Sequence, residues 1–267
     1  MPVSARADLA KDALCMKLLD LALHRRMMRN WRKAALNAPA MKLSELRHLR
    51  AQGRKLNHYL GEALAVAENR LALPVVGSSA FPRPHGTDWA WRPEIWRLPL
   101  PAPGMASVPS KAMFGREVTL FHDCARSELS LRQVRNSREA DLAPYGVRMD
   151  VFAFDGSFLS LVIDLPREAT EGLTRRHLIR LDTIVELEKP LEIFARLNVR
   201  HGPNTEQIVR ELPLNEEEIM VEFDLAYSNI NEKRIERGWI DLIFENPQMS
   251  QVILRDVTLS RRPRAAL

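Results

Sequence analysis

The spacing of the hydrophobic residues changes once along this chain, and the change limits the possible folds more than any other feature of the sequence. Before about residue 73 they recur every three or four positions, as at Leu14, Leu18 and Leu21. After Val118 they recur at every second position, as at Ile193, Ala195, Leu197 and Val199. The first spacing is typical of amphipathic helices and the second of strands with one buried face. The sequence therefore predicts an α+β fold with helices first and β structure afterwards.

Two helices are predicted in the region 1–73. Helical spacing extends over Ala5–Leu36, and an a/d spacing typical of coiled coils follows over Leu43–Leu71. Pro39 separates the two helices, because proline has no amide hydrogen and disfavours helix in the residue before it. A short connection between two amphipathic helices favours an antiparallel helical hairpin, in which each helix covers the hydrophobic face of the other.

The region 74–117 is rich in proline and tryptophan. It holds eight of the 17 prolines and three of the five tryptophans, Trp89, Trp91 and Trp96. This density of proline prevents a helix or a central strand, whereas three large aromatic side chains need apolar surface to cover. We therefore expect an irregular strap that packs on the following domain. The alternative is an aromatic platform for stacking on sugars or bases.

The region 118–267 is predicted to contain ten strands separated by turns such as Asp155-Gly156 and Asn246-Pro247. The strand ranges are Val118–Phe121, Leu129–Val134, Val147–Phe154, Phe158–Leu165, Leu178–Leu187, Leu191–Val199, Gln207–Leu212, Ile219–Tyr227, Trp239–Phe244 and Val252–Ser260. No long helix is predicted between them, which favours antiparallel pairing over a parallel α/β sheet. Strands of this number and length predict a jelly-roll-like antiparallel β-sandwich.

Positive charge is concentrated in the helical region. The formal net charge of the chain is +5, but residues 1–73 alone hold 14 Lys and Arg against 6 Asp and Glu. Helical spacing places five cations on one side of the first helix: Arg25, Arg26, Arg29, Arg32 and Lys33. Such a face suits an acidic protein or an anionic membrane surface. No recognised DNA-reading motif accompanies it, which disfavours nucleic acid; a solvated face and a homo-oligomer formed through the hairpin are two further alternatives.

Motifs for catalysis or metal binding are not found. The seven histidines have no zinc-site spacing, and motifs for binding phosphate or dinucleotides are missing, so no metal, cofactor or catalytic residue is predicted. Two cysteines, Cys15 and Cys124, are too few for a disulfide framework. The trio His122-Asp123-Cys124 is interpreted as structural, because consecutive residues at a strand end point in different directions.

The expected location is the cytoplasm, with attachment to the inner face of the membrane as an alternative. The longest hydrophobic runs are only a few residues, too short for a transmembrane helix. Arg6 and Asp8 lie where a signal peptide would need an uncharged stretch.

Two stretches near the end of the chain, Leu191–Pro203 and Trp239–Ser260, resemble the late strands of carbohydrate-binding modules and of galactose-binding-like sandwiches. The whole chain resembles a bacterial family of unknown function, in which a basic helical start, a segment like Gly86–Pro93 and a segment like His201–Gln207 recur. The first resemblance implies a sugar-binding sandwich fold, and the second supplies no catalytic residues.

A ligand-binding face is predicted on the sandwich from the alternation of its strands. Its polar side would present Arg180, Phe194, Arg196, Asn198, Arg200, Trp239 and Asp241, with His201, Asn204 and Gln207 at the rim. Aromatic, Arg, Asn and Asp side chains together suit a glycan, and a protein ligand is the alternative. A ligand-binding face of this kind predicts a non-enzymatic binding or adaptor protein.

Two other interpretations of this face remain open: it is covered or solvated, or it belongs to a glycan-modifying or hydrolytic enzyme. A glycosidase would need two carboxylates across a cleft. Carboxylate pairs such as Asp182 with Glu186 and Glu222 with Asp224 are instead expected to pair across strands with Arg180, Arg196 and Arg200.

Overall fold

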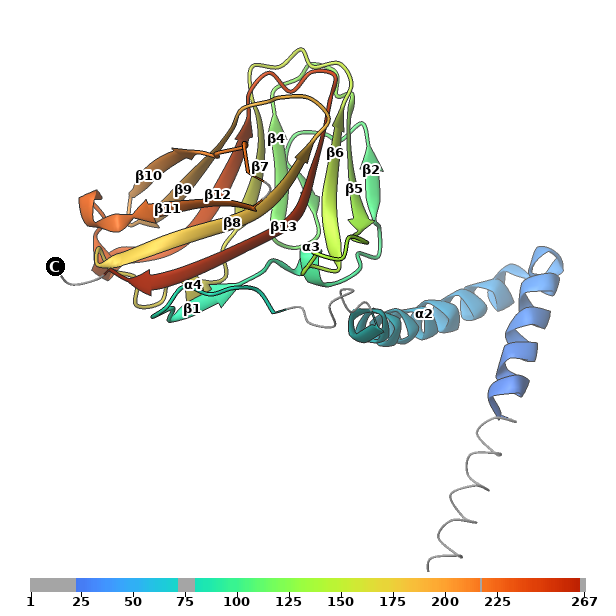
Figure 1. Cartoon of the computed structure of the whole chain (residues 1–267). Helices are drawn as coiled ribbons and strands as arrows, with labels where there is room; N and C mark the ends of the chain where they lie inside the picture. Colours follow the sequence, from blue (N-terminus) through green and yellow to red (C-terminus); the bar gives the residue numbers. More distant parts are fainter. Residues whose placement is uncertain (1–22, 72–79, 217, 265–267) are drawn as a thin grey trace, which may run out of the picture. The chain divides into compact units, whose positions relative to one another are not determined.

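The computed structural model describes residues 23–71, 80–216 and 218–264 (Figure 1). The chain divides into two compact units, Met1–Ala63 and Leu64–Leu267, which are described separately below. The predicted helix over Ala5–Leu36 begins outside the described residues, so only its second half can be compared with the structure. None of the described helices is long and apolar enough to span a membrane.

The helical unit contains a helix over residues 23–37, the short helix η1 (Ala38–Ala40) and the beginning of α2 (Leu43–Leu71). Pro39 lies in η1, where the first helix ends. The Trp31 ring lies against Gly53, since a Cβ atom on that glycine would be 3.6 Å from the ring. The predicted pair of helices is confirmed, and Trp31 and Gly53 mark the seam between them.

The second unit is a sandwich of two antiparallel sheets, as predicted (Figure 1). Sheet A has the order β11-β8-β13-β6-β5-β2, and β1 pairs with β13. Its strands are β1 (Trp89–Trp91), β2 (Gly104–Ala106), β5 (Leu129–Arg135), β6 (Tyr145–Val151), β8 (His177–Leu187), β11 (Glu218–Asp224) and β13 (Ser250–Pro263). Sheet B has the order β10-β9-β12-β7-β4-β3. Its strands are β3 (Ala112–Phe114), β4 (Val118–His122), β7 (Leu159–Asp164), β9 (Ile193–His201), β10 (Asn204–Glu211) and β12 (Ile235–Phe244).

Four short helical segments connect these strands: α3 (Glu94–Arg97), α4 (Arg167–Thr170), η2 (Leu225–Tyr227) and η3 (Glu232–Arg234). Each of the ten strands predicted from the sequence overlaps one of the strands β4 to β13. The core lies between the sheets and is built from alternate residues, as on β9, where Ile193, Ala195, Leu197 and Val199 are buried. The two-residue alternation therefore identified the inward side of β9 correctly, whereas Tyr227, predicted to face inward at the end of its strand, lies on η2 and is exposed.

Residues 80–117, the described part of the proline-rich region, pack on the sandwich as expected but are more regular than the strap that we predicted. They contribute β1, β2, β3 and the helical turn α3, and their short strands take edge positions where proline is tolerated. Trp96 is completely buried, and Trp89 and Trp91 pack against the core. This segment is part of the sandwich, and its aromatic side chains complete the core.

Three side chains fix this segment to the sheets. Arg92 donates from Nε and Nη2 to the two carboxylate oxygens of Asp256 at 2.8 and 2.7 Å, and both side chains are buried. The Trp96 indole donates to the backbone oxygen of Leu254 at 2.9 Å. The side-chain amide of Gln133 donates to the backbone oxygens of Ile95 and Leu98. Its oxygen accepts a hydrogen bond from the backbone N–H of Leu100.

A β-bulge on β13 changes which of its residues face the core. The pairing with β8 shifts between Leu254 and Asp256, so no residue of β8 lies opposite Arg255 in the strand register. Val252 and Leu254 are buried before the bulge, and Val257 and Leu259 after it. An inserted residue reverses the alternation of a strand. In this strand it aligns Asp256 with Arg92.

Candidate functional site

The outer face of sheet B carries the main candidate site, and the strand register determines which side chains lie beside one another. In one row across the sheet, Asp241 of β12 lies between Arg196 of β9 and Val162 of β7. In the next row, Ile243 lies between Phe194 and Ser160. In the row on the other side, Trp239 lies between Asn198 and Asp164.

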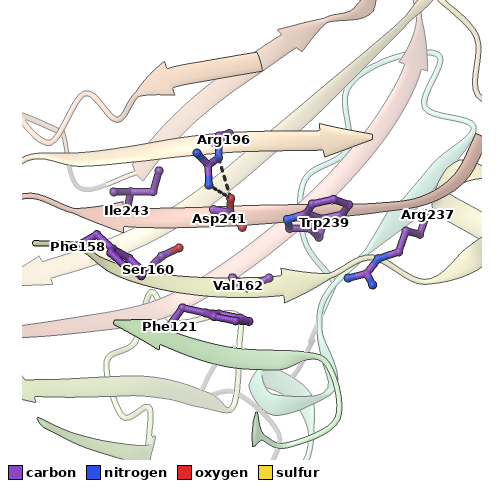
Figure 2. Close-up of a pocket in the computed structure, with 9 residues that line it drawn as sticks. All are labelled: Phe121, Phe158, Ser160, Val162, Arg196, Arg237, Trp239, Asp241 and Ile243. Carbon is purple, nitrogen blue, oxygen red and sulfur yellow. Dashed lines mark hydrogen bonds and ion pairs between the residues drawn. The ribbon is translucent and has the colours of Figure 1, made fainter. Parts of the chain in front are cut away.

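These rows form a groove of about 450 Å³. It is lined by Phe121, Phe158, Ser160, Val162, Arg196, Arg237, Trp239, Asp241 and Ile243. The side chains lie on the adjacent strands β9, β12, β7 and β4, with Phe158 directly before β7, and Figure 2 shows Arg196 reaching from β9 to Asp241 on β12. Most of the lining is apolar or aromatic, with a few polar groups among it, which is typical of binding sites for small ligands.

Asp241 is the centre of a buried hydrogen-bond network. Arg196 donates from Nε and Nη2 to Asp241 Oδ2 at 2.8 and 2.5 Å, and Asn198 Nδ2 donates to the same oxygen at 3.1 Å. Only 4% of the Asp241 side chain is exposed, against 34% of the Arg196 side chain. The carboxylate therefore holds the guanidinium in one orientation, with part of it open to the groove.

Ser160 brings a buried hydroxyl to the same groove. The residue is 6% exposed, and its Oγ atom has no hydrogen-bond partner among the described residues. Buried hydroxyls are normally hydrogen-bonded, because leaving one without a partner costs about 1–3 kcal/mol. An uncompensated hydroxyl beside Asp241 is a polar group that a ligand could satisfy.

Aromatic side chains flank the polar centre. The Arg237 guanidinium lies over the Trp239 ring, 4.8 Å from the ring centroid, and forms an ion pair of 2.7 Å with Asp164. Phe158 is 45% exposed, and Phe121 lies opposite Ser160 in the strand register. These contacts hold the indole in place and leave apolar surface at the edge of the groove.

Asp123 fixes the loop that carries Phe158. Its carboxylate accepts hydrogen bonds from the Ser157 backbone N–H, the Ser157 hydroxyl and the Phe158 backbone N–H, at 2.7, 2.6 and 3.2 Å. The Ser157 hydroxyl is the main reason why the pKa of Asp123 is lowered from its ordinary value of 3.8. Gly156 permits this arrangement, since a Cβ atom there would lie 2.5 Å from Asp123 Oδ1.

We expect Asp123→Asn to loosen this loop. The amides of Ser157 and Phe158 should exchange hydrogen for deuterium faster than in the unchanged protein, whereas Glu188→Gln, which removes an exposed carboxylate elsewhere on the sandwich, should leave them unaffected. Because the folded pKa of Asp123 is lowered, its stabilising effect is present above the unfolded pKa and is lost as the pH falls through the folded pKa. Equal exchange rates in the two variants would contradict the bracing role.

The predicted ligand-binding residues are not all brought together. Arg196, Trp239 and Asp241 line the groove, and Phe194 lies in the neighbouring row. Asn198 is completely buried and also accepts a hydrogen bond from Gln207 at 3.0 Å, so it positions Asp241.

The prediction was wrong for Arg180, which lies on β8 of sheet A and binds Asp182 on its own strand. Because both sheets show the same alternation, the sequence pattern could not distinguish between them.

Arg200, predicted on the polar face, and the three predicted rim residues do not line the groove. Arg200 forms an ion pair of 3.1 Å with Glu236 on β12, and Asn204 and Gln207 are exposed on β10. His201 is buried, and its Nδ1 accepts the Asn231 backbone N–H at 3.3 Å.

Pairing across strands occurs for Arg196 and Arg200, but with Asp241 and Glu236 as partners. Of the carboxylates expected as partners, Asp182 does pair with Arg180, although on the same strand. The others are bound elsewhere: Glu222 pairs with Arg262, Glu186 with Arg255 and Asp224 with Arg264.

The trio His122-Asp123-Cys124 is held in a structural arrangement. His122 Nδ1 accepts the backbone N–H of Cys124 at 3.2 Å, and His122 Nε2 lies 2.9 Å from the backbone oxygen of Val108. Both ring nitrogens are therefore engaged, and burial raises the pKa of the Cys124 thiol. Within the described parts of the chain, no three His, Cys, Asp or Glu side chains are grouped so as to hold a metal ion.

Six residues that line the groove were not predicted as ligand-binding from the sequence: Phe121, Phe158, Ser160, Val162, Arg237 and Ile243. The alternation of Phe158, Ser160 and Val162 already placed them on one face of a predicted strand. That this strand neighbours β12 is a matter of topology, which the alternation does not reveal. In the helical unit, the five predicted cations Arg25, Arg26, Arg29, Arg32 and Lys33 are all exposed.

Comparisons with solved structures find carbohydrate-binding modules and a domain of a phage tailspike protein, all at low similarity. A family 11 carbohydrate-binding module from Clostridium thermocellum, solved with a β-1,3-1,4-mixed-linked tetrasaccharide, matches with a TM-score of 0.38 and 12% identity, over 61% of this chain and 99% of the module. A family 22 module of the same organism's Xyn10B matches with a TM-score of 0.36 and 6% identity, over 70% and 99%. The enzymatically active domain of a bacteriophage CBA120 tailspike protein matches with a TM-score of 0.37 and 8% identity, over 53% of this chain, which spans only 19% of the tailspike chain.

Sequence comparison assigns the chain to a family. A search of the curated proteins found no match. One family model matches residues 11–267, which is nearly the whole chain and includes the described helical unit and the sandwich. The chain therefore belongs to the family of unknown function DUF6478.

Proposed function

We propose that the groove on sheet B binds a neutral saccharide. The observation that supports this most directly is the buried hydroxyl of Ser160, which has no hydrogen-bond partner in the described part of the chain and lies near the Arg196–Asp241 pair, with aromatic rings around them. A sugar ring has an apolar C–H face that packs on aromatic rings and hydroxyls that both donate and accept. The groove offers surfaces for both, with donors on Arg196 and a hydroxyl on Ser160.

The charge balance of the groove favours an uncharged ligand. Arg196 is paired with Asp241, and Arg237 is paired with Asp164. An acidic sugar would have to compete with these carboxylates for the guanidinium groups.

The enzymatic alternative has less support, because Asp241 is the only carboxylate among the nine lining residues. Its Oδ2 already accepts three hydrogen bonds, whereas a glycosidase uses two carboxylates on either side of the scissile bond.

Trp239→Ala tests this proposal in the full chain. A glycan array identifies the ligand, and titration calorimetry then measures its affinity. We expect Trp239→Ala to weaken binding about tenfold or more, because the indole is the largest apolar surface of the groove. Tyr227→Ala is the matched control, since Tyr227 is an exposed aromatic residue on η2 and does not line the groove. A clean negative on neutral glycans, or equal affinities of the two variants, would reject the proposal.

Ser160→Ala separates ligand binding from folding. The Ser160 hydroxyl has no partner among the described residues, so its removal should leave the free energy of unfolding unchanged or slightly higher. If the saccharide binds this hydroxyl, the affinity should fall about two- to tenfold. An unchanged affinity with an unchanged stability would show that the ligand does not reach Ser160.

A second role concerns the helical unit, which we propose recruits an anionic partner. Residues 23–61 hold ten Lys and Arg but a single carboxylate, that of Glu45. A solvated helix face would ordinarily mix charges of both signs, as in the i to i+4 pairs that stabilise exposed helices. The excess of cations supports attraction to a negatively charged surface.

A further inference from the structure

The two helices of the helical unit carry the same pattern in opposite directions from their connection. Counting back along the first helix, Leu36 is followed by arginines at distances of four, seven and eleven residues, Arg32, Arg29 and Arg25. Counting forward along α2, Leu43 is followed at the same distances by Arg47, Arg50 and Arg54. At 3.6 residues per turn these distances place all four residues of each set on one stripe. We call each set a Leu-Arg stripe.

Both leucines are unusually open to solvent. Leu36 is 73% exposed and Leu43 is 75% exposed, although both lie next to the turn that joins the helices. The contact between the helices uses other residues, such as Trp31 and Gly53, so packing of the pair does not require the two leucines. Each helix therefore presents a large hydrophobic side chain to solvent at the same end of the pair.

The six arginines of the stripes are also exposed. Over residues 23–61 the structure shows no ion pair or side-chain hydrogen bond for any of them, and the single carboxylate of this stretch, Glu45, could neutralise only one. The arginine side chains on each helix are thus open to solvent. On each helix they form a row that begins at an exposed leucine.

The combination of leucine and arginine selects the kind of partner. A nucleic acid backbone or an acidic peptide would attract the arginines, but the phosphate backbone offers nothing apolar to Leu36 and Leu43. An anionic lipid bilayer offers both, because its headgroups attract arginine and its interface accepts leucine side chains. We infer that the helical unit docks on an anionic lipid surface through its turn, with Leu36 and Leu43 entering the interface and the arginines binding headgroups. This inference rests on the recruiting role proposed above and is independent of the saccharide groove.

The test is sedimentation of the full chain with lipid vesicles. We expect the protein to bind vesicles of phosphatidylcholine that contain phosphatidylserine, and to bind vesicles of phosphatidylcholine alone much more weakly. Added salt should weaken the binding, because exposed charges are screened. Two soluble polyanions, double-stranded DNA and polyglutamate, are tested in parallel at the same salt concentration.

Two variants separate the leucines from the arginines. Arg25→Glu/Arg29→Glu/Arg32→Glu should reduce vesicle binding by a hundredfold or more, since each surface cation contributes roughly a factor of five. Leu36→Gln/Leu43→Gln should reduce vesicle binding about tenfold and leave binding to the soluble polyanions unchanged. The matched control for charge is Arg116→Glu/Arg126→Glu/Arg167→Glu, in which three exposed arginines of the sandwich are reversed; it should bind vesicles almost as well as the unchanged protein.

The outcomes distinguish the lipid inference from the recruiting role and from the saccharide proposal. Binding to DNA or polyglutamate without binding to vesicles would overturn the lipid inference and leave the recruiting role standing. Failure to bind any of the three anions would overturn both. Equal vesicle binding by the leucine variant would also overturn the insertion of Leu36 and Leu43. Trp239→Ala should bind vesicles normally in every case, so a failure of the saccharide proposal is recognised separately.

Discussion

Asp256→Ala is expected to lower the free energy of unfolding of the sandwich by about 3–5 kcal/mol, because it leaves the Arg92 guanidinium buried without its counter-charge. The two side chains are joined by two hydrogen bonds of 2.8 and 2.7 Å, and Arg92 is 3% exposed. Urea unfolding of the full chain, followed by near-ultraviolet circular dichroism, measures the change.

A double variant distinguishes a buried charge from a general packing defect. Arg92→Met/Asp256→Val removes both charges and should be more stable than Asp256→Ala alone, since hydrophobic replacements of a buried ion pair are often neutral. A double variant less stable than the single one would contradict this account. A loss below about 1 kcal/mol in Asp256→Ala would show that water reaches Arg92 when the carboxylate is removed.

Trp96→Ala is the second substitution with a large expected effect, a loss of about 3–5 kcal/mol in the free energy of unfolding. Trp96 is completely buried between α3 and the core, and its indole donates to the backbone oxygen of Leu254 next to the bulge of β13. Removing it leaves a cavity and an unsatisfied carbonyl oxygen.

Trp96→Phe separates these two contributions. Phenylalanine fills most of the same volume but cannot donate to Leu254, so the expected loss is only about 1–3 kcal/mol. The same urea experiment compares the two variants. Similar losses in Trp96→Ala and Trp96→Phe would mean that the hydrogen bond, and not the volume of the side chain, dominates.

The strands of the sandwich could be predicted because their alternation is a local property. Ile193, Ala195 and Leu197 are separated by single residues, and a strand with one buried face needs no other information to be recognised. The same reasoning placed Arg196, Trp239 and Asp241 on outward faces, where the structure finds them beside one another.

The neighbours of those residues could not be predicted in the same way. Ser160 lies on β7 and Phe158 directly before it, about 80 residues before Trp239 and Asp241, and both become their neighbours only because β7 pairs with β12. Arg180 was placed on the same face because its strand alternates equally well, although β8 belongs to the other sheet. Pairing across long separations is decided by tertiary packing, which single strands do not encode.

The sequence by itself determined the described helices before residue 73, the ten strands after Val118 and the inward side of strands such as β9 and β12, because these depend on periodicities of a few residues. Only the tertiary structure decided that the proline-rich segment contributes strands and Trp96 to the sandwich, that a bulge aligns Asp256 with Arg92, and that four strands of sheet B enclose a groove. These features depend on contacts between residues far apart in the chain, and their free energy exists only when both partners are in place.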